Sequence, residues 1–307
     1  MKKDFLSIPD LTKEEIFEIF DLTKELKEKT RRRESHRLLE GYSLAMIFAK
    51  PSARTRLSFE TGIYQLGGYG IYLSPQDIGI GKREAVKDVA RVISGYNDLI
   101  IARLFDHAHI EELAEYSSVP VINGLTDYNH PCQIMADAYS ILEQKDNLDN
   151  LKVVYIGDGN NVANSWLNFA SIVPMHLAIC TPPDYLPDKS TTENAQNHSR
   201  STVEILSDPV EAVQEADVVY TDVWASMGQE AESEARKKIF QSFQVNTELM
   251  SNAKEDAIVM HCLPAHRGDE ITDEVLESQN SIVFAEAENR LHVQKAIMVK
   301  LARRQKN

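Results

Sequence analysis

Cysteine is scarce in this sequence, and long apolar segments are missing. The 307 residues include 3 cysteines, Cys132, Cys180 and Cys262, which lie far apart and form no CxxC pair. An odd number of scattered cysteines argues against a disulfide framework, so we expect a protein of the reducing cytoplasm. No apolar run approaches the ~20 residues of a membrane helix, and the early charges of MKKDFLSIPDLTKEE do not suit a signal peptide. We therefore expect neither a membrane span nor export.

Positive charge is also in deficit. Lys and Arg total 33 against 47 Asp and Glu, which gives a formal net charge of -14. A general attraction to nucleic acid or to an anionic membrane is therefore disfavoured. Any anionic ligand must be held by a local positive field.

Short apolar runs alternate with helical patterns along the whole chain. Thr12 and Glu15 have the spacing of a capping box, which predicts that a first helix begins there. Further helical patterns cover 84–94, 108–115 and 131–144. The runs expected to form strands are 42–48, 70–74, 98–102, 119–123, 152–157, 176–180, 201–206, 217–223 and 257–263. This β-α-β-α order predicts an α/β fold in which helices flank parallel sheets.

A polar segment, KDNLDN, interrupts this order and indicates two domains joined by interdomain helices. We expect residues 1–140 to form the first domain and residues 141–285 the second. The last helical stretch, 286–307, is long enough to pack back on the first domain.

The segment KPSARTR follows a predicted strand and opens a predicted helix. Backbone N–H groups, the Ser52 and Thr55 hydroxyls, and the Arg54 and Arg56 guanidiniums can converge there on one anion, such as phosphate. A solvated basic turn or an interdomain salt bridge is the alternative interpretation.

Other polar residues also follow predicted strands, where parallel sheets bind ligands. Arg103 comes directly after DLIIA, and His130 precedes a proline suited to the first turn of a helix, with Gln133 one turn on. Asp222 ends another strand. Taken singly, His130 also suits a plain loop, and the Asp222 segment suits a capped turn.

Two apparent motifs fit their usual functions poorly. YIGDGNNVANS resembles a dinucleotide fingerprint, but Val162 takes the third glycine position, so a small polar ligand meeting Asn161 is favoured over NAD. His261, Cys262 and His266 lie close together in HCLPAHRGDEIT, yet no second cysteine pair completes a zinc site. We therefore expect no cofactor and no metal.

Together these motifs resemble the transcarbamylase family over nearly the whole chain. SARTR resembles the family's phosphate loop, HPCQ its H-P-x-Q element, DVWASMG the loop that separates ornithine from aspartate enzymes, and HCLP and EAENR its later motifs. The resemblance implies a catalytic set of Arg103, His130, Cys262 and Asp222. It implies that carbamoyl phosphate is bound by Ser52, Ala53, Arg54, Thr55, Arg56, Arg103, His130, Gln133, Cys262, Leu263 and Arg290. It implies that ornithine is bound by Asn161, Asp222, Ser226 and Met227.

The activity implied by this resemblance is transfer of a carbamoyl group from carbamoyl phosphate to the δ-amine of L-ornithine, yielding citrulline and phosphate in arginine biosynthesis. The family also implies a homotrimer or a larger assembly of trimers. Putrescine, N-acetylornithine and aspartate remain alternative acceptors. An NAD-dependent enzyme or an inactive carbamoyl phosphate-binding paralogue are alternatives of other classes.

Two positions depart from the family pattern. Ala53 replaces a second threonine in the phosphate loop, and Gly79 stands where relatives often present glutamine or histidine from a neighbouring subunit to the phosphate. Gln76 and Lys82 lie nearby in the sequence. We expect weaker carbamoyl phosphate binding from the loss of these side chains.

Overall fold

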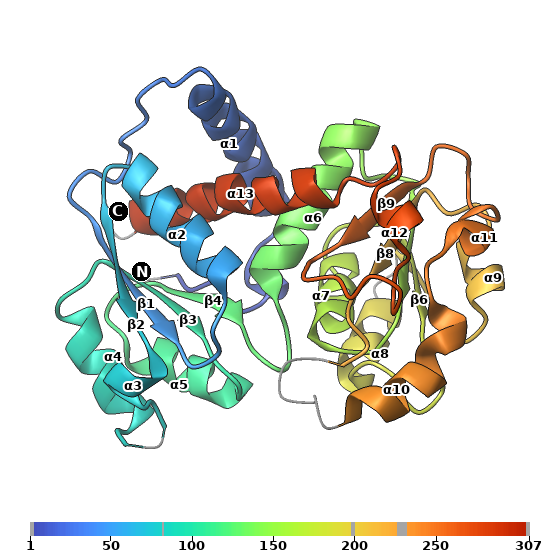
Figure 1. Cartoon of the computed structure of the whole chain (residues 1–307). Helices are drawn as coiled ribbons and strands as arrows, with labels where there is room; N and C mark the ends of the chain where they lie inside the picture. Colours follow the sequence, from blue (N-terminus) through green and yellow to red (C-terminus); the bar gives the residue numbers. More distant parts are fainter. Residues whose placement is uncertain (1–2, 82, 198–199, 226–231, 305–307) are drawn as a thin grey trace. The chain divides into compact units, whose positions relative to one another are not determined.

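The computed structural model describes residues 3–81, 83–197, 200–225 and 232–304 (Figure 1). It divides into unit 1, formed by Met1–Met135 and Glu288–Asn307, and unit 2, formed by Ala136–Ala287. The chain passes from one unit to the other within helices α6 (Pro131–Lys145) and α13 (Val283–Arg304). The predicted α/β class with two parallel sheets is confirmed.

Unit 1 is built on a four-stranded parallel sheet of order β2-β1-β3-β4. Its strands are β1 (Ser43–Phe48), β2 (Tyr69–Leu73), β3 (Leu99–Arg103) and β4 (Val121–Leu125). Besides its parts of α6 and α13, its helices are η1 (Ile8–Asp10), α1 (Lys13–Arg31), α2 (Ala53–Gln65), α3 (Pro75–Ile78), α4 (Val86–Ser94) and α5 (His107–Tyr116).

Local sequence signals determine where several of these helices begin. The predicted capping box at Thr12 and Glu15 is present at the start of α1, and Ser52 caps α2. Helix α6 begins at Pro131, as predicted. Helices α4 and α5 bury apolar residues such as Val89 and Leu113 against β1 and β3.

Unit 2 is built on a five-stranded parallel sheet of order β7-β6-β5-β8-β9. Its strands are β5 (Lys152–Ile156), β6 (His176–Cys180), β7 (Thr202–Leu206), β8 (Val218–Thr221) and β9 (Ile258–His261). Its other elements are α7 (Asn161–Ala170), α8 (Lys189–Asn197), α9 (Pro209–Val213), α10 (Ser233–Phe240), η3 (Gln241–Phe243), α11 (Thr247–Met250) and α12 (Asp273–Leu276). Because β5, β8 and β9 are parallel neighbours, the residues that follow them lie at one edge of the sheet.

None of the helices in the described part of the chain is long and apolar enough to cross a membrane.

A cluster of buried cationic and imidazole groups joins α1, α2 and α13 within unit 1. Lys295 is fully buried and donates to Thr30 Oγ1 at 2.7 Å and to Gln65 Oε1 at 2.8 Å. Burial lowers the pKa of Lys295 to about 8. Burial, and then the neighbouring charges of which Lys295 is the largest, lowers the pKa of His292 to about 3. His292 is therefore neutral in the folded protein at pH 7.

This burial predicts a specific loss of stability in acid. The folded pKa of His292 lies below the ordinary value of 6.5, so between the two the unfolded chain binds more protons and stability falls as pH falls. We expect His292→Gln to flatten the decrease by up to about 1.4 kcal/mol per pH unit between roughly pH 6 and pH 4. Urea unfolding of both proteins across this range measures the difference, and parallel stability curves would contradict it.

Candidate active site

The start of α2 brings two hydroxyls and a buried guanidinium together in unit 1. Ser52 Oγ accepts from Thr55 N at 3.3 Å and donates to Thr55 Oγ1 at 3.1 Å. Arg290 Nη2, from α13, donates to the same Thr55 oxygen at 2.8 Å. Three of the residues predicted to bind carbamoyl phosphate are therefore in contact.

Arg54 and Arg56 take different positions on this helix. Both are exposed, and Arg56 donates from Nε to Glu60 Oε2 at 3.1 Å while its guanidinium lies 4.0 Å from the centre of the Tyr72 ring. Residues two apart on a helix do not share a face, so the spacing predicts that the two guanidiniums point in different directions. Ala53 is the exposed first residue of α2. The roles of these three residues stay predictions.

A second part of the unit 1 site lies at the ends of β3 and β4. Arg103 is the last residue of β3, His130 directly precedes α6, and Gln133 lies in its first turn. All three are buried. Burial lowers the pKa of His130 well below its ordinary value, and the positive charges of Arg290 and Arg103 lower it further. His130 is therefore a neutral imidazole beside two buried guanidiniums, and Arg103, His130 and Arg290 together are called the cationic cluster.

A mainly apolar cavity of about 400 Å³ also lies in unit 1, lined by residues 47–49, 75, 78–81, 104–106 and 109. It includes Gly79 but none of the residues predicted to bind substrate. Gly79 has a φ of +55°, and a Cβ there would lie 2.9 Å from Arg83 Cβ. Glycine at this position therefore satisfies a local backbone requirement. Lys82 lies outside the described residues.

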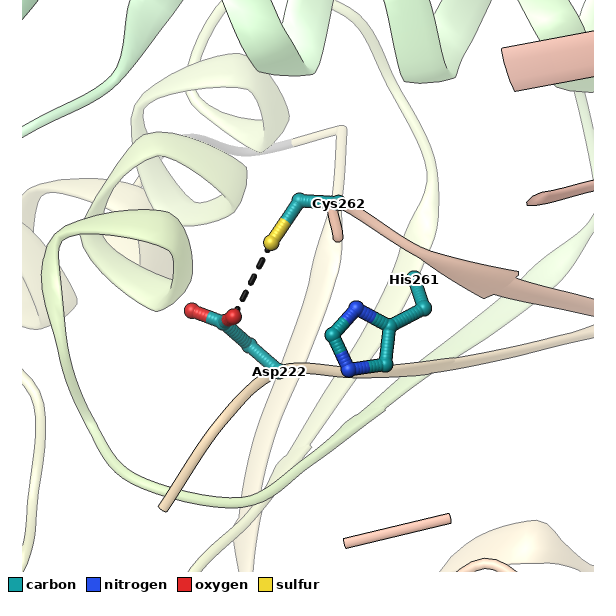
Figure 2. A group of neighbouring side chains, drawn as sticks. All are labelled: Asp222, His261 and Cys262. Carbon is teal, nitrogen blue, oxygen red and sulfur yellow. Dashed lines mark hydrogen bonds between the residues drawn. The ribbon is translucent and has the colours of Figure 1, made fainter. Parts of the chain in front are cut away.

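In unit 2, a buried carboxylate gathers donors from the ends of three strands. Asp222, after β8, accepts through Oδ1 from Val223 N at 2.8 Å and from Cys262 Sγ at 2.9 Å. Its Oδ2 accepts from Asn160 Nδ2, after β5, at 2.8 Å. Figure 2 shows the Cys262 sulfur directed at the carboxylate, with the His261 ring beside the pair. Asn160, Asp222 and Cys262 are called the Asp222 cluster.

Asn160 contacts Asp222 although no motif indicated a role for it, and the role predicted for its neighbour Asn161 stays a prediction. Asn160 caps α7, because its Oδ1 accepts from Val162 N at 2.8 Å and from Ala163 N at 3.3 Å, and its amide then reaches Asp222. Asn161 is the first residue of α7. An asparagine before a helical pattern is a capping signal that could have identified Asn160. Ser226 and Met227 lie outside the described residues.

Cys262 is a protonated thiol. Burial of the thiol group, followed by the charge of Asp222 and the hydrogen bond to it, raises its pKa well above the ordinary value. A thiolate is the reactive form of cysteine, so this thiol suits hydrogen-bond donation better than nucleophilic attack.

Asp222, His261 and Cys262 each carry a possible metal-ligating atom, and these atoms lie within 4.8 Å of one another. However, His261 Nδ1 accepts from Leu263 N at 2.9 Å, and its Nε2 bonds the fully buried Glu270 carboxylate at 3.0 Å. Both ring nitrogens are thus engaged, which makes His261 a poor ligand. The hydrogen bond that His261 Nδ1 accepts instead stabilises Leu263, whose φ of +54° is unfavourable for leucine.

The protonated thiol predicts slow alkylation of Cys262. At pH 8 an exposed cysteine is about one quarter thiolate, so iodoacetamide should label Cys262 at least about tenfold more slowly in folded than in urea-unfolded protein. Asp222→Asn should accelerate labelling of the folded protein, because it removes the charge that opposes the thiolate. Peptide mass spectrometry resolves Cys262 from Cys132 and Cys180, and equal folded and unfolded rates would refute the assignment.

Two family descriptions together match almost the whole chain. Residues 3–143 match the carbamoyl-P binding domain of aspartate/ornithine carbamoyltransferase. Residues 149–301 match the Asp/Orn binding domain of the same family.

Individual relatives agree with this match over nearly their full lengths. The chain is 54% identical to an ornithine carbamoyltransferase of Thermococcus kodakarensis, with 96% of this chain and 95% of the relative covered. The solved ornithine carbamoyltransferase of Pyrococcus furiosus superposes with a TM-score of 0.93 at 51% identity, covering 97% of this chain and 96% of that one. The anabolic ornithine carbamoyltransferase of Campylobacter jejuni gives a TM-score of 0.92 at 40% identity, covering 98% and 99%. The chain therefore belongs to the aspartate/ornithine carbamoyltransferase family.

Proposed function

We propose that this protein is an ornithine carbamoyltransferase, which transfers the carbamoyl group of carbamoyl phosphate to the δ-amine of L-ornithine and releases L-citrulline and phosphate. Family membership and the names of the relatives support the reaction. The structural observation that carries the choice of ornithine is the buried Asp222 carboxylate, held by Asn160 and Cys262 at the strand ends of unit 2. A buried carboxylate of this kind suits the α-ammonium group of a free amino acid.

In this proposal, unit 1 binds carbamoyl phosphate. The N-terminus of α2, with Ser52 and Thr55, suits the phosphoryl group because N–H groups and the helix dipole favour an anion. Arg54 lies in the same turn and is exposed, so its guanidinium remains accessible to the phosphate. Arg103 and neutral His130 donate toward the carbonyl oxygen and stabilise the negative charge that develops there as the amine attacks.

The nucleophile is the δ-amine of ornithine, so no covalent enzyme intermediate is required. An amine with a lysine-like pKa of ~10.4 is neutral in only about one molecule in 2,500 at pH 7. The δ-ammonium must therefore lose one proton to solvent before attack. The attacking nitrogen loses a second proton as the carbamoyl group is transferred, and the departing phosphate is a suitable acceptor for it. In unit 2, Asp222 suits the α-ammonium group of the substrate.

The alternative acceptors differ in the groups that Asp222 would meet. N-acetylornithine carries a neutral amide in place of the α-ammonium, and aspartate lacks the δ-amine. Putrescine keeps an ammonium but has no α-carboxylate. Ornithine alone offers the δ-amine, the α-ammonium and the α-carboxylate together.

A parallel assay of these four acceptors tests the proposal. With saturating carbamoyl phosphate, we expect kcat/KM for ornithine to exceed that for each alternative by roughly a hundredfold or more, because buried polar groups of the site stay unpaired with the others. A comparable or higher value for putrescine, N-acetylornithine or aspartate would replace the assigned substrate.

An Asp222→Asn variant examines the carboxylate itself. Losing the charge beside a buried ammonium should lower kcat/KM for ornithine. The expected loss of transition-state stabilisation is about 3 to 5 kcal/mol. The matched substrate is 5-aminopentanoate, which keeps the reacting amine and the carboxylate but lacks the α-ammonium. It should lose far less activity, and an unchanged ratio of the two substrates would show that Asp222 does not bind the α-ammonium.

We also propose that the protein assembles as a homotrimer, as the family resemblance implies. Edge strand β2 exposes Tyr69 and Ile71, and α2 exposes Leu57 and Tyr64. We assign these apolar side chains to the interface with a second copy of the chain. Light scattering should give about three times 34.7 kDa. An Ile71→Lys, Leu57→Lys double variant should lower this mass, whereas exposed Val210→Lys should not. A monomeric wild type would contradict the assembly.

A further inference from the structure

Arg236, on α10, is a buried guanidinium that joins separate segments of unit 2. It is 7% exposed. Its Nη1 donates to Asp158 Oδ2 at 2.8 Å and to the Trp224 carbonyl oxygen at 2.9 Å, and its Nε donates to Glu232 Oε2 at 3.2 Å. Its guanidinium carbon also lies 4.9 Å from the centre of the Tyr185 ring. None of the sequence motifs indicated a role for this residue.

The first contact of Arg236 fixes the turn that carries Asn160. Asp158 follows β5, and its carbonyl oxygen accepts from Tyr155 Oη at 2.9 Å and from Asn160 N at 2.7 Å. Arg236 bonds the side chain of Asp158, so the backbone carbonyl and the carboxylate of this residue both have hydrogen-bond partners. Asn160 in turn donates to Asp222. A displacement of Asp158 would therefore move a donor of the Asp222 cluster.

The second contact of Arg236 fixes the segment that carries Asp222 itself. Trp224 lies two residues beyond Asp222, and its ring stacks on Phe240 with a centroid distance of 6.0 Å. Arg236 holds the Trp224 carbonyl, while Phe240 ends the helix on which Arg236 lies. The segment that follows β8 therefore contacts α10 through both a hydrogen bond and an aromatic stack.

Arg236 also balances charge beside the Asp222 cluster. Burial raises the pKa of Asp158, and Arg236 opposes that rise, whereas the negative charge of Asp222 adds to it. Asp158 and Asp222 are thus two buried carboxylates that influence each other. Without the guanidinium, Asp158 would be an unpaired buried charge, which is strongly unfavourable.

We propose that Arg236 is a positioning residue for ornithine binding, acting through Asp158 and Trp224 on the orientation and the electrostatic surroundings of Asp222. The proposal rests on the assignment of ornithine to the Asp222 cluster. It predicts that the effect of Arg236 falls mainly on ornithine, because the residues predicted to bind carbamoyl phosphate belong to unit 1, except for Cys262 and Leu263.

The test compares Arg236→Gln, Arg236→Lys, Asp158→Asn and the Arg236→Gln, Asp158→Asn double variant in the full-length enzyme. We expect Arg236→Gln to raise KM for ornithine by roughly tenfold or more and to change KM for carbamoyl phosphate by less than about twofold. Arg236→Lys should lie between this variant and wild type, because an ammonium can pair with Asp158 without bonding Trp224 as well. The double variant should recover part of the ornithine affinity lost in Arg236→Gln, because it no longer buries an unpaired carboxylate.

A matched control is Arg267→Gln, which removes an exposed arginine of unit 2 that also pairs with two carboxylates, Asp273 and Glu277. It should leave both KM values unchanged. Thermal unfolding of each variant separates loss of folded protein from loss of affinity. Equal rises of KM for both substrates, or a double variant no better than Arg236→Gln, would overturn the proposal.

Asp222→Asn separates failure of the positioning role of Arg236 from failure of the ornithine assignment. If Asp222→Asn weakens ornithine binding while Arg236→Gln does not, the positioning role is wrong and the ornithine assignment stands. If neither variant affects ornithine, the assignment of the Asp222 cluster fails, and the positioning role fails with it.

Discussion

A buried carboxylate needs donors on every side, and this requirement organises the polar residues of unit 2. Asp222 is 6% exposed and obtains its donors from Asn160, Cys262 and the Val223 amide. Two of these donors follow the neighbouring strands β5 and β9. The strand order β5-β8-β9 is therefore the structural reason that residues up to 102 positions apart in the sequence meet, as Asn160 and Cys262 do around Asp222.

Unit 1, in contrast, brings buried positive charges together, although the chain has a net charge of -14. Arg103 and Arg290 are both at least nine-tenths buried, and His130 beside them stays uncharged because its pKa is lowered by burial and by these two guanidiniums. A dianionic substrate would relieve the repulsion between the two arginines. Because acidic residues outnumber basic ones over the whole chain, 47 to 33, attraction of a small anion depends on this local concentration of positive charge.

Sequence reasoning identified the features that depend on local signals. The alternation of strands and helices, the capping box at Thr12 and the start of α6 at Pro131 were all predicted, because each depends on a few neighbouring residues. The contacts of Asn160, Glu270 and Arg236 were not predicted, because each depends on which strands become neighbours and in what register. The helical separation of Arg54 and Arg56 follows from their spacing alone, because residues two apart on a helix do not share a face.

In the proposed reaction, His130 and Cys262 act without gaining or losing a proton, and the proton transfers take place on the substrate. Burial lowers the pKa of His130, and burial with the neighbouring Asp222 raises that of Cys262, so neither group is charged at neutral pH. Both can therefore serve only as hydrogen-bonding dipoles there. A fixed arrangement of neutral dipoles and permanently charged guanidiniums does not itself need to exchange protons during turnover. Both protons that move come from the δ-amine of the acceptor, the first to solvent and the second to the departing phosphate, and the enzyme supplies the electrostatic field in which they leave.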